Sequence, residues 1–149
     1  MKKLSTLLFV LFLVGCQQMD TRVENPQPGD IQGKWEALNL GKVLSYGLLS
    51  FDSEGNGVFI AVNGEEAGLL LKVDSFKSKE RSFQVTAHFI DEGERTDKAA
   101  VFEGELDQGV LCLFLTEENQ DEDTKQPFCF SHYKEINKYR KMADQALDT

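Results

Sequence analysis

Basic residues, histidines and long hydrophobic runs are all scarce in this chain of 149 residues. Its 16 lysines and arginines stand against 25 acidic residues, and the resulting net charge of −9 excludes binding to the phosphate backbone of nucleic acid. The two histidines, His88 and His132, have no cysteine, serine or carboxylate at the spacing of a catalytic or metal site. We therefore expect a protein that is not an enzyme and that uses no cofactor and no metal ion.

The main apolar run, residues 4–14, is about half as long as the roughly 20 residues that a transmembrane helix needs. Lys2 and Lys3 precede the run, and a polar stretch follows it from Gln17 onward. A basic start, a short apolar segment and small residues before a cleavage point are typical of a secretory signal peptide. We predict that residues 1–15 are removed on export.

The end of this run, Leu13-Val14-Gly15-Cys16, resembles the lipobox of bacterial lipoproteins. The resemblance implies that Cys16 becomes the first residue of the mature protein and carries a diacylglycerol, usually with a further acyl chain. Two or more chains anchor a protein stably in a membrane. Because Gln17 and not an aspartate follows the cysteine, the family's sorting habit implies the outer membrane, facing the periplasm, in a Gram-negative host. A plain cleaved signal peptide is the alternative.

Residues 17–30 contain Asn25, Pro26, Pro28 and Gly29 and show no apolar periodicity. Such a composition is typical of a flexible segment. We predict that residues 16–30 form a lipidated tether and that residues 31–149 form one folded domain.

From Ile31 onward, short runs with β-type alternation are separated by turn residues at intervals of about eight to twelve residues. The clearest alternation, within 83–89, puts Phe83 and Phe89 on the apolar face of a strand. Strands are predicted at 33–40, 43–51, 57–62, 68–76, 81–90, 98–106, 109–116 and 126–134. Because no connection is long enough for a crossover helix, neighbouring strands should pair antiparallel, and closure into a barrel removes the free edges. The sequence predicts an all-β fold, a small eight-stranded antiparallel meander barrel.

A change of period after Tyr133 predicts one more element. Apolar residues recur at helical spacing, at Ile136, Tyr139, Met142 and Leu147. We predict a C-terminal amphipathic helix over 135–147 that packs on the barrel wall. Binding of this helix to a membrane surface is the alternative.

Cys112 and Cys129 form an even pair in a chain that we expect to be exported, which predicts one disulfide. When the two cysteines are placed opposite each other in the last hairpin, Leu113 faces Phe128 and the apolar residues of both strands share one face. A slip of one residue would break this match. Free buried thiols are the alternative.

The segment Gly33-Lys34-Trp35 resembles the Gly-x-Trp signature of lipocalins, in which the tryptophan closes one end of an eight-stranded barrel. The strand number, the meander order and the C-terminal helix are lipocalin-like as well. The chain departs from the family in the turn 106–109, where lipocalins have a Thr-Asp-Tyr segment, and in the short turn 40–42, where they have a helix. Membership would imply a small ligand cavity inside the barrel.

The barrel interior is the best candidate site, because eight strands can enclose side chains alone or one small ligand. We expect Trp35, Phe83 and Phe89 to contact a small apolar ligand in a membrane-anchored envelope lipoprotein. The alternative is a protein-interaction or inhibitor module with a filled barrel, which engages a basic envelope protein through its acidic surface or a rim loop. Small disulfide-bearing lipoprotein barrels that inhibit lysozyme are of this second kind.

Overall fold

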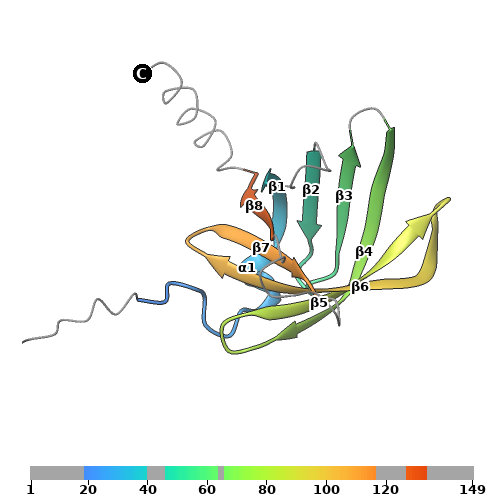
Figure 1. Cartoon of the computed structure of the whole chain (residues 1–149). Helices are drawn as coiled ribbons and strands as arrows, with labels where there is room; N and C mark the ends of the chain where they lie inside the picture. Colours follow the sequence, from blue (N-terminus) through green and yellow to red (C-terminus); the bar gives the residue numbers. More distant parts are fainter. Residues whose placement is uncertain (1–18, 40–45, 64–65, 117–126, 134–149) are drawn as a thin grey trace, which may run out of the picture.

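The fold, seen in a computed structural model that describes residues 19–39, 46–63, 66–116 and 127–133, is a closed barrel of eight strands (Figure 1). The strands follow one another around the barrel in sequence order, every neighbouring pair is antiparallel, and β8 pairs with β1 to close the sheet. The strands are β1 Gly33–Asn39, β2 Tyr46–Phe51, β3 Gly57–Asn63, β4 Glu66–Ser78, β5 Phe83–Asp91, β6 Glu94–Asp107, β7 Val110–Leu115 and β8 Phe128–His132. The predicted all-β meander barrel is confirmed, whereas Cys16 and the predicted helix 135–147 lie outside the described residues.

Alternation along each strand fills the barrel with apolar side chains. In β5, Phe83, Val85 and Ala87 are almost fully buried, while the residues between them are only partly buried. The same period of two places Leu111 and Leu113 of β7 inside. The core therefore lies within the barrel and receives side chains from all eight strands. Within the described ranges, no helix has the length and hydropathy that are needed to cross a membrane.

The connection between β5 and β6 is shorter than predicted. We expected a linker over 91–97, but β5 extends to Asp91 and β6 begins at Glu94, so only Glu92 and Gly93 connect them. Both have positive φ angles, 48° and 85°, as in the two-residue turns that suit the twist of a hairpin. Residues 94–98 are largely exposed on both faces of the hairpin and therefore show no apolar alternation. For this reason the start of β6 was not predicted from the sequence.

The segment before β1 also differs from the prediction. We expected residues 16–30 to be a flexible tether, but residues 19–32 cross one end of the barrel. The backbone N–H of Val23 donates to the carbonyl of Leu106 at 2.9 Å, and that of Asn25 donates to Glu80 at 2.6 Å. The short helix α1, Pro28–Ile31, then brings the fully buried Ile31 beneath the core. Single apolar residues and backbone hydrogen bonds fix this segment, and neither produces a periodic sequence signal.

These contacts give the barrel two different ends. We call the end covered by residues 19–32 the closed end, where the turns 52–56, 79–82 and 108–109 also lie. We call the opposite end, where the β5–β6 turn lies, the open end, because no segment among the described residues crosses it as residues 19–32 cross the closed end. Figure 1 shows the blue N-terminal segment beside the β4–β5 hairpin at the closed end.

Candidate ligand-binding pocket

The closed end of the barrel is filled by aromatic side chains. Trp35 is only 3% exposed, and its Nε1 donates a hydrogen bond to the carbonyl of Ile31 at 2.7 Å. Phe83 is fully buried and stacks on Phe76 with ring centroids 5.2 Å apart. Gly104 of β6 makes room for the Phe83 ring, because a Cβ at that position would overlap it. Aromatic rings therefore occupy the barrel interior at this end.

Small inward-facing residues gather toward the open end. Each lies two positions from a large core residue of its own strand, so it shares that residue's face. Ala87 of β5 and Ala100 of β6 even face each other in the ladder. The set consists of Ala37, Gly47, Ala61, Ala87 and Ala100. Ala61 and Ala87 are enclosed, at 0% and 1% exposed, whereas Ala100 borders a space that the larger side chains do not fill.

An apolar pocket of about 320 Å³ occupies this end of the barrel. Its size lies at the lower end of the range for small-molecule sites, roughly 300–1,000 Å³. Among the described residues, no charged side chain lines it. The lining consists of Phe59, Leu69, Leu71, Phe89, Ala99, Ala100, Val101, Phe102, Leu115, Thr116 and Phe128. Such a surface favours an apolar ligand, because contact with the ligand removes apolar surface from water.

The three predicted ligand-contacting residues lie in two different places. Phe89 lines the pocket, whereas Trp35 and Phe83 belong to the filled closed end. Large aromatic residues were expected to contact the ligand, whereas Ala100 and the aliphatic wall around Leu71 were not predicted. The pairing of small residues across neighbouring strands was the available signal, but it becomes visible only when the register is known.

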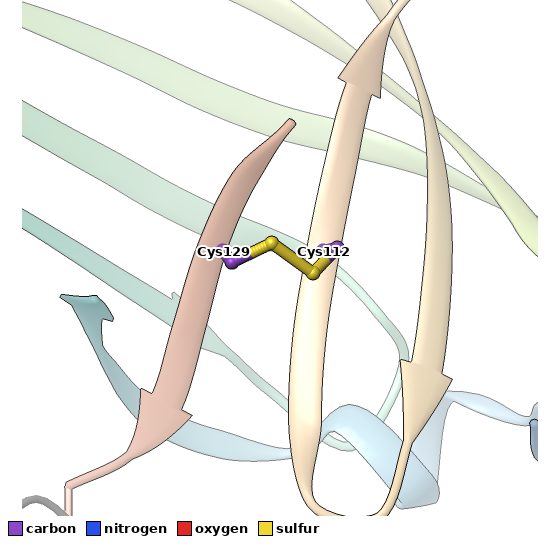
Figure 2. Close-up of a disulfide and its surroundings, with 2 residues drawn as sticks. All are labelled: Cys112 and Cys129. Carbon is purple, nitrogen blue, oxygen red and sulfur yellow. A yellow bond between two sulfur atoms is a disulfide. The ribbon is translucent and has the colours of Figure 1, made fainter. Parts of the chain in front are cut away.

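The disulfide Cys112–Cys129 secures one wall of the pocket. It joins β7 to β8 (Figure 2), and the two Cα atoms are 4.1 Å apart. The predicted register is confirmed, since Cys112 faces Cys129 and Leu113 faces Phe128. The cysteines lie on the face opposite the buried Leu113. They hold in place the five-residue strand that supplies Phe128 to the pocket.

The two histidines lie in different surroundings. On the outer wall, Nδ1 of His88 is 2.9 Å from Oδ2 of Asp74, to which Nε of Arg95 also donates at 2.9 Å. His132 packs edge-on against Trp35 with ring centroids 5.2 Å apart. Within the described part of the chain, no group of histidine, cysteine and acidic side chains is arranged to hold a metal ion.

Ion pairs attach the N-terminal segment to the closed end. Arg22 contacts Glu105 of β6 at 2.8 Å, and Arg81 contacts Glu24 at 2.7 Å, while Arg22 and Asp20 pair within the segment at 2.7 Å. The Arg22 side chain, by hydrogen bonding, holds the pKa of Asp20 well below its usual value. In the turn 52–56, the backbone N–H of Glu54 is the main cause of a lowered pKa at Asp52. Both carboxylates stabilise the fold in their ionised form.

No family model, no curated protein and no solved structure matches this chain.

Proposed function

We propose that this chain is a lipid-anchored, non-enzymatic protein of the cell envelope that binds a small apolar ligand in a lipocalin-like barrel. The observation that carries the proposal is the apolar pocket of about 320 Å³ at the open end. A barrel with a filled interior would pack large side chains at both ends. Here Ala100, a small residue of β6, lines a space at the open end that the larger side chains around it leave unfilled.

The membrane anchor is supported by the lipobox-like segment and by the position of the N-terminal residues. Only residues 17–19 separate Cys16 from Asp20, which contacts Arg81 of the β4–β5 turn at 3.5 Å. At no more than about 3.6 Å per residue, this stretch spans less than about 15 Å. A lipid on Cys16 would therefore keep the closed end near the head groups and direct the open end away from that membrane. The ligand would enter from the aqueous side.

Native mass spectrometry tests the ligand directly. The chain from Gln17 onward, exported to a bacterial periplasm and purified, should carry an excess mass that disappears on denaturation. The stripped protein should then bind N-phenyl-1-naphthylamine, an apolar dye that becomes fluorescent in apolar surroundings.

A matched pair of variants locates the binding. Ala100→Phe places a ring in the pocket and should weaken dye binding at least about tenfold, the equivalent of 1.4 kcal/mol. Thr86→Phe places the same ring on the outer face of β5 and should leave dye binding unchanged.

A bare mass combined with no dye binding would contradict the ligand and favour the protein-interaction alternative, in which binding to a basic partner weakens steeply with salt. The anchor is tested separately in the full-length chain. Cys16→Ser should release it from membranes, and retention of the variant would contradict lipidation.

A further inference from the structure

The barrel wall is interrupted beside the pocket, between β4 and β5. The ladder that joins these strands ends at the pair Leu71 and Phe89, although β4 starts at Glu66 and β5 continues to Asp91. Between this pair and the open end, β4 pairs only with β3, and β5 pairs only with β6. Figure 1 shows the yellow β5–β6 hairpin bending away from the first residues of β4.

Irregularities in the ladders explain why the hairpin bends. The pairing of β4 with β5 shifts between Val73 and Ser75, and that of β5 with β6 shifts between His88 and Ile90. Such bulges bend a strand and increase its twist. On the outer wall, Asp74 bonds to both His88 and Arg95. This cluster connects the β5–β6 hairpin to β4 beside the interruption.

A groove of about 450 Å³ lies at the interruption and adjoins the pocket. Leu69 and Phe89 line both spaces, so these two side chains form the boundary between them. The rest of the groove is apolar near the boundary and polar along the hairpin. Its further lining residues are Gly68, Leu70, Ile90, Asp91, Thr96 and Lys98.

We propose that the pocket and the groove form one site for a single-chain amphiphile with a carboxylate head. This inference rests on the proposed function, because it assigns the apolar part of the ligand to the pocket. The chain would pass between Leu69 and Phe89, and the head would accept hydrogen bonds from the Thr96 hydroxyl and the Lys98 ammonium group. Asp91 lines the same groove, and its charge disfavours a head with several negative charges.

The volume of the pocket sets the length of the buried chain. At about 30 Å³ per group, the liquid volume of a water molecule and close to that of a methylene, the pocket holds about ten methylene groups. Each buried methylene should raise the affinity about fourfold. Affinity should therefore rise along a series of alkanoic acids and level off once about ten groups are buried.

Competition against N-phenyl-1-naphthylamine tests the assignment. Alkanoic acids of eight to sixteen carbons and the matching alkanols are titrated into the dye-bound chain from Gln17 onward. Lys98→Gln should weaken the binding of the acids about threefold, the size of an exposed ion pair, and leave the alkanols unchanged. Lys77→Gln, which removes an exposed lysine of β4 that lines neither space, serves as the control.

A second variant tests the groove itself. Ile90→Trp should fill the groove, weakening the longer acids while dye binding in the pocket is retained. If the dye binds but acids and alkanols of equal length bind equally, and neither Lys98→Gln nor Ile90→Trp has an effect, the amphiphile assignment is overturned and the apolar pocket stands. If the dye does not bind at all, the proposed function fails as well.

Discussion

The two ends of the barrel are built from the same eight strands, yet they use their inward positions differently. At the closed end, Trp35 and Phe83 meet other aromatic rings and the N-terminal segment covers them. At the open end, Phe59 and Phe89 line a space that Ala100 leaves unfilled. Alternation makes both ends apolar inside. The size of the side chains and the covering segment determine which end of the barrel interior is filled.

Side chains at the two ends are expected to contribute differently to stability and to ligand binding. Side chains at the closed end contact neighbours on all sides, and their removal leaves cavities. Side chains around the pocket already border empty volume, so their loss should cost less stability and more binding. The following substitutions test this division.

The largest effect is expected for Phe83→Ala. The ring is fully buried and stacked on Phe76, and its removal should lower the free energy of unfolding by about 3–5 kcal/mol. Phe89→Ala, at the open end, should cost clearly less and should weaken dye binding. Urea unfolding measures the first property and dye titration the second. Equal losses of stability would show that the open end is packed as tightly as the closed end.

The disulfide should contribute nearly as much to the free energy of unfolding as the Phe83 ring does. Cys112 and Cys129 are 17 residues apart, and a loop of that length implies about 3 kcal/mol of stabilisation. The double variant Cys112→Ser/Cys129→Ser should lose this amount in urea unfolding, and the reduced wild type should behave like it. An unchanged unfolding midpoint would mean that the pairing of β8 with β1 and β7 is sufficient to fix the pocket wall.

Gly104→Ala tests the packing of the closed end by adding volume instead of removing it. The added methyl group overlaps the Phe83 ring, and we expect a loss of about 1–3 kcal/mol. Gly68→Ala is the matched control, because a Cβ there makes only ordinary contacts, the nearest at 3.4 Å. Combining Gly104→Ala with Phe83→Leu should recover part of the loss. No recovery would show that the overlap with Phe83 is not the cause.

The smallest effect concerns acid pH and the segment that covers the closed end. Because Arg22 lowers the pKa of Asp20 in the folded protein, the ionised carboxylate stabilises the fold above its ordinary pKa of 3.8. This contribution is lost as the pH falls below that value toward the lower pKa of the folded state.

Asp20→Asn should therefore lower the melting temperature at pH 7, and the difference from wild type should shrink below pH 3. The effect should also weaken with salt, because the pair is exposed. Amide exchange at Val23 and Asn25 reports the same loss locally. A difference that persists unchanged in acid would exclude the Asp20–Arg22 pair as its cause.

Much of the barrel could be predicted from the sequence. Turn residues such as Asp52 and Asn56, which bond to each other's backbone or side chain, separate the runs that become strands. The pairing of Cys112 with Cys129 followed from matching Leu113 with Phe128. These features are local or involve one hairpin, so their signals lie close together in the chain.

The pocket could be predicted only in part. Phe83 and Phe89 were selected from one regular alternation and Trp35 from the Gly-x-Trp resemblance, but Phe89 lines the pocket whereas Trp35 and Phe83 lie at the filled end. Which end an inward residue faces depends on strand direction and register around the whole barrel. Ala100 of β6 lines the pocket together with Leu71 of β4 and Phe128 of β8, and no pattern within one strand reveals this grouping.

By itself, the sequence determined the all-β meander, the single disulfide and the apolar interior, because alternation, turn chemistry and one register argument are properties of neighbouring residues. The tertiary structure decided that residues 19–32 close one end, that the other end retains a pocket and that the wall parts between β4 and β5. These features depend on the hydrogen bond of Val23 to Leu106, on the pocket that Ala100 and Phe128 line together, and on the end of the β4–β5 ladder at Phe89. Such contacts join different segments of the chain, so the pattern within one segment does not predict them.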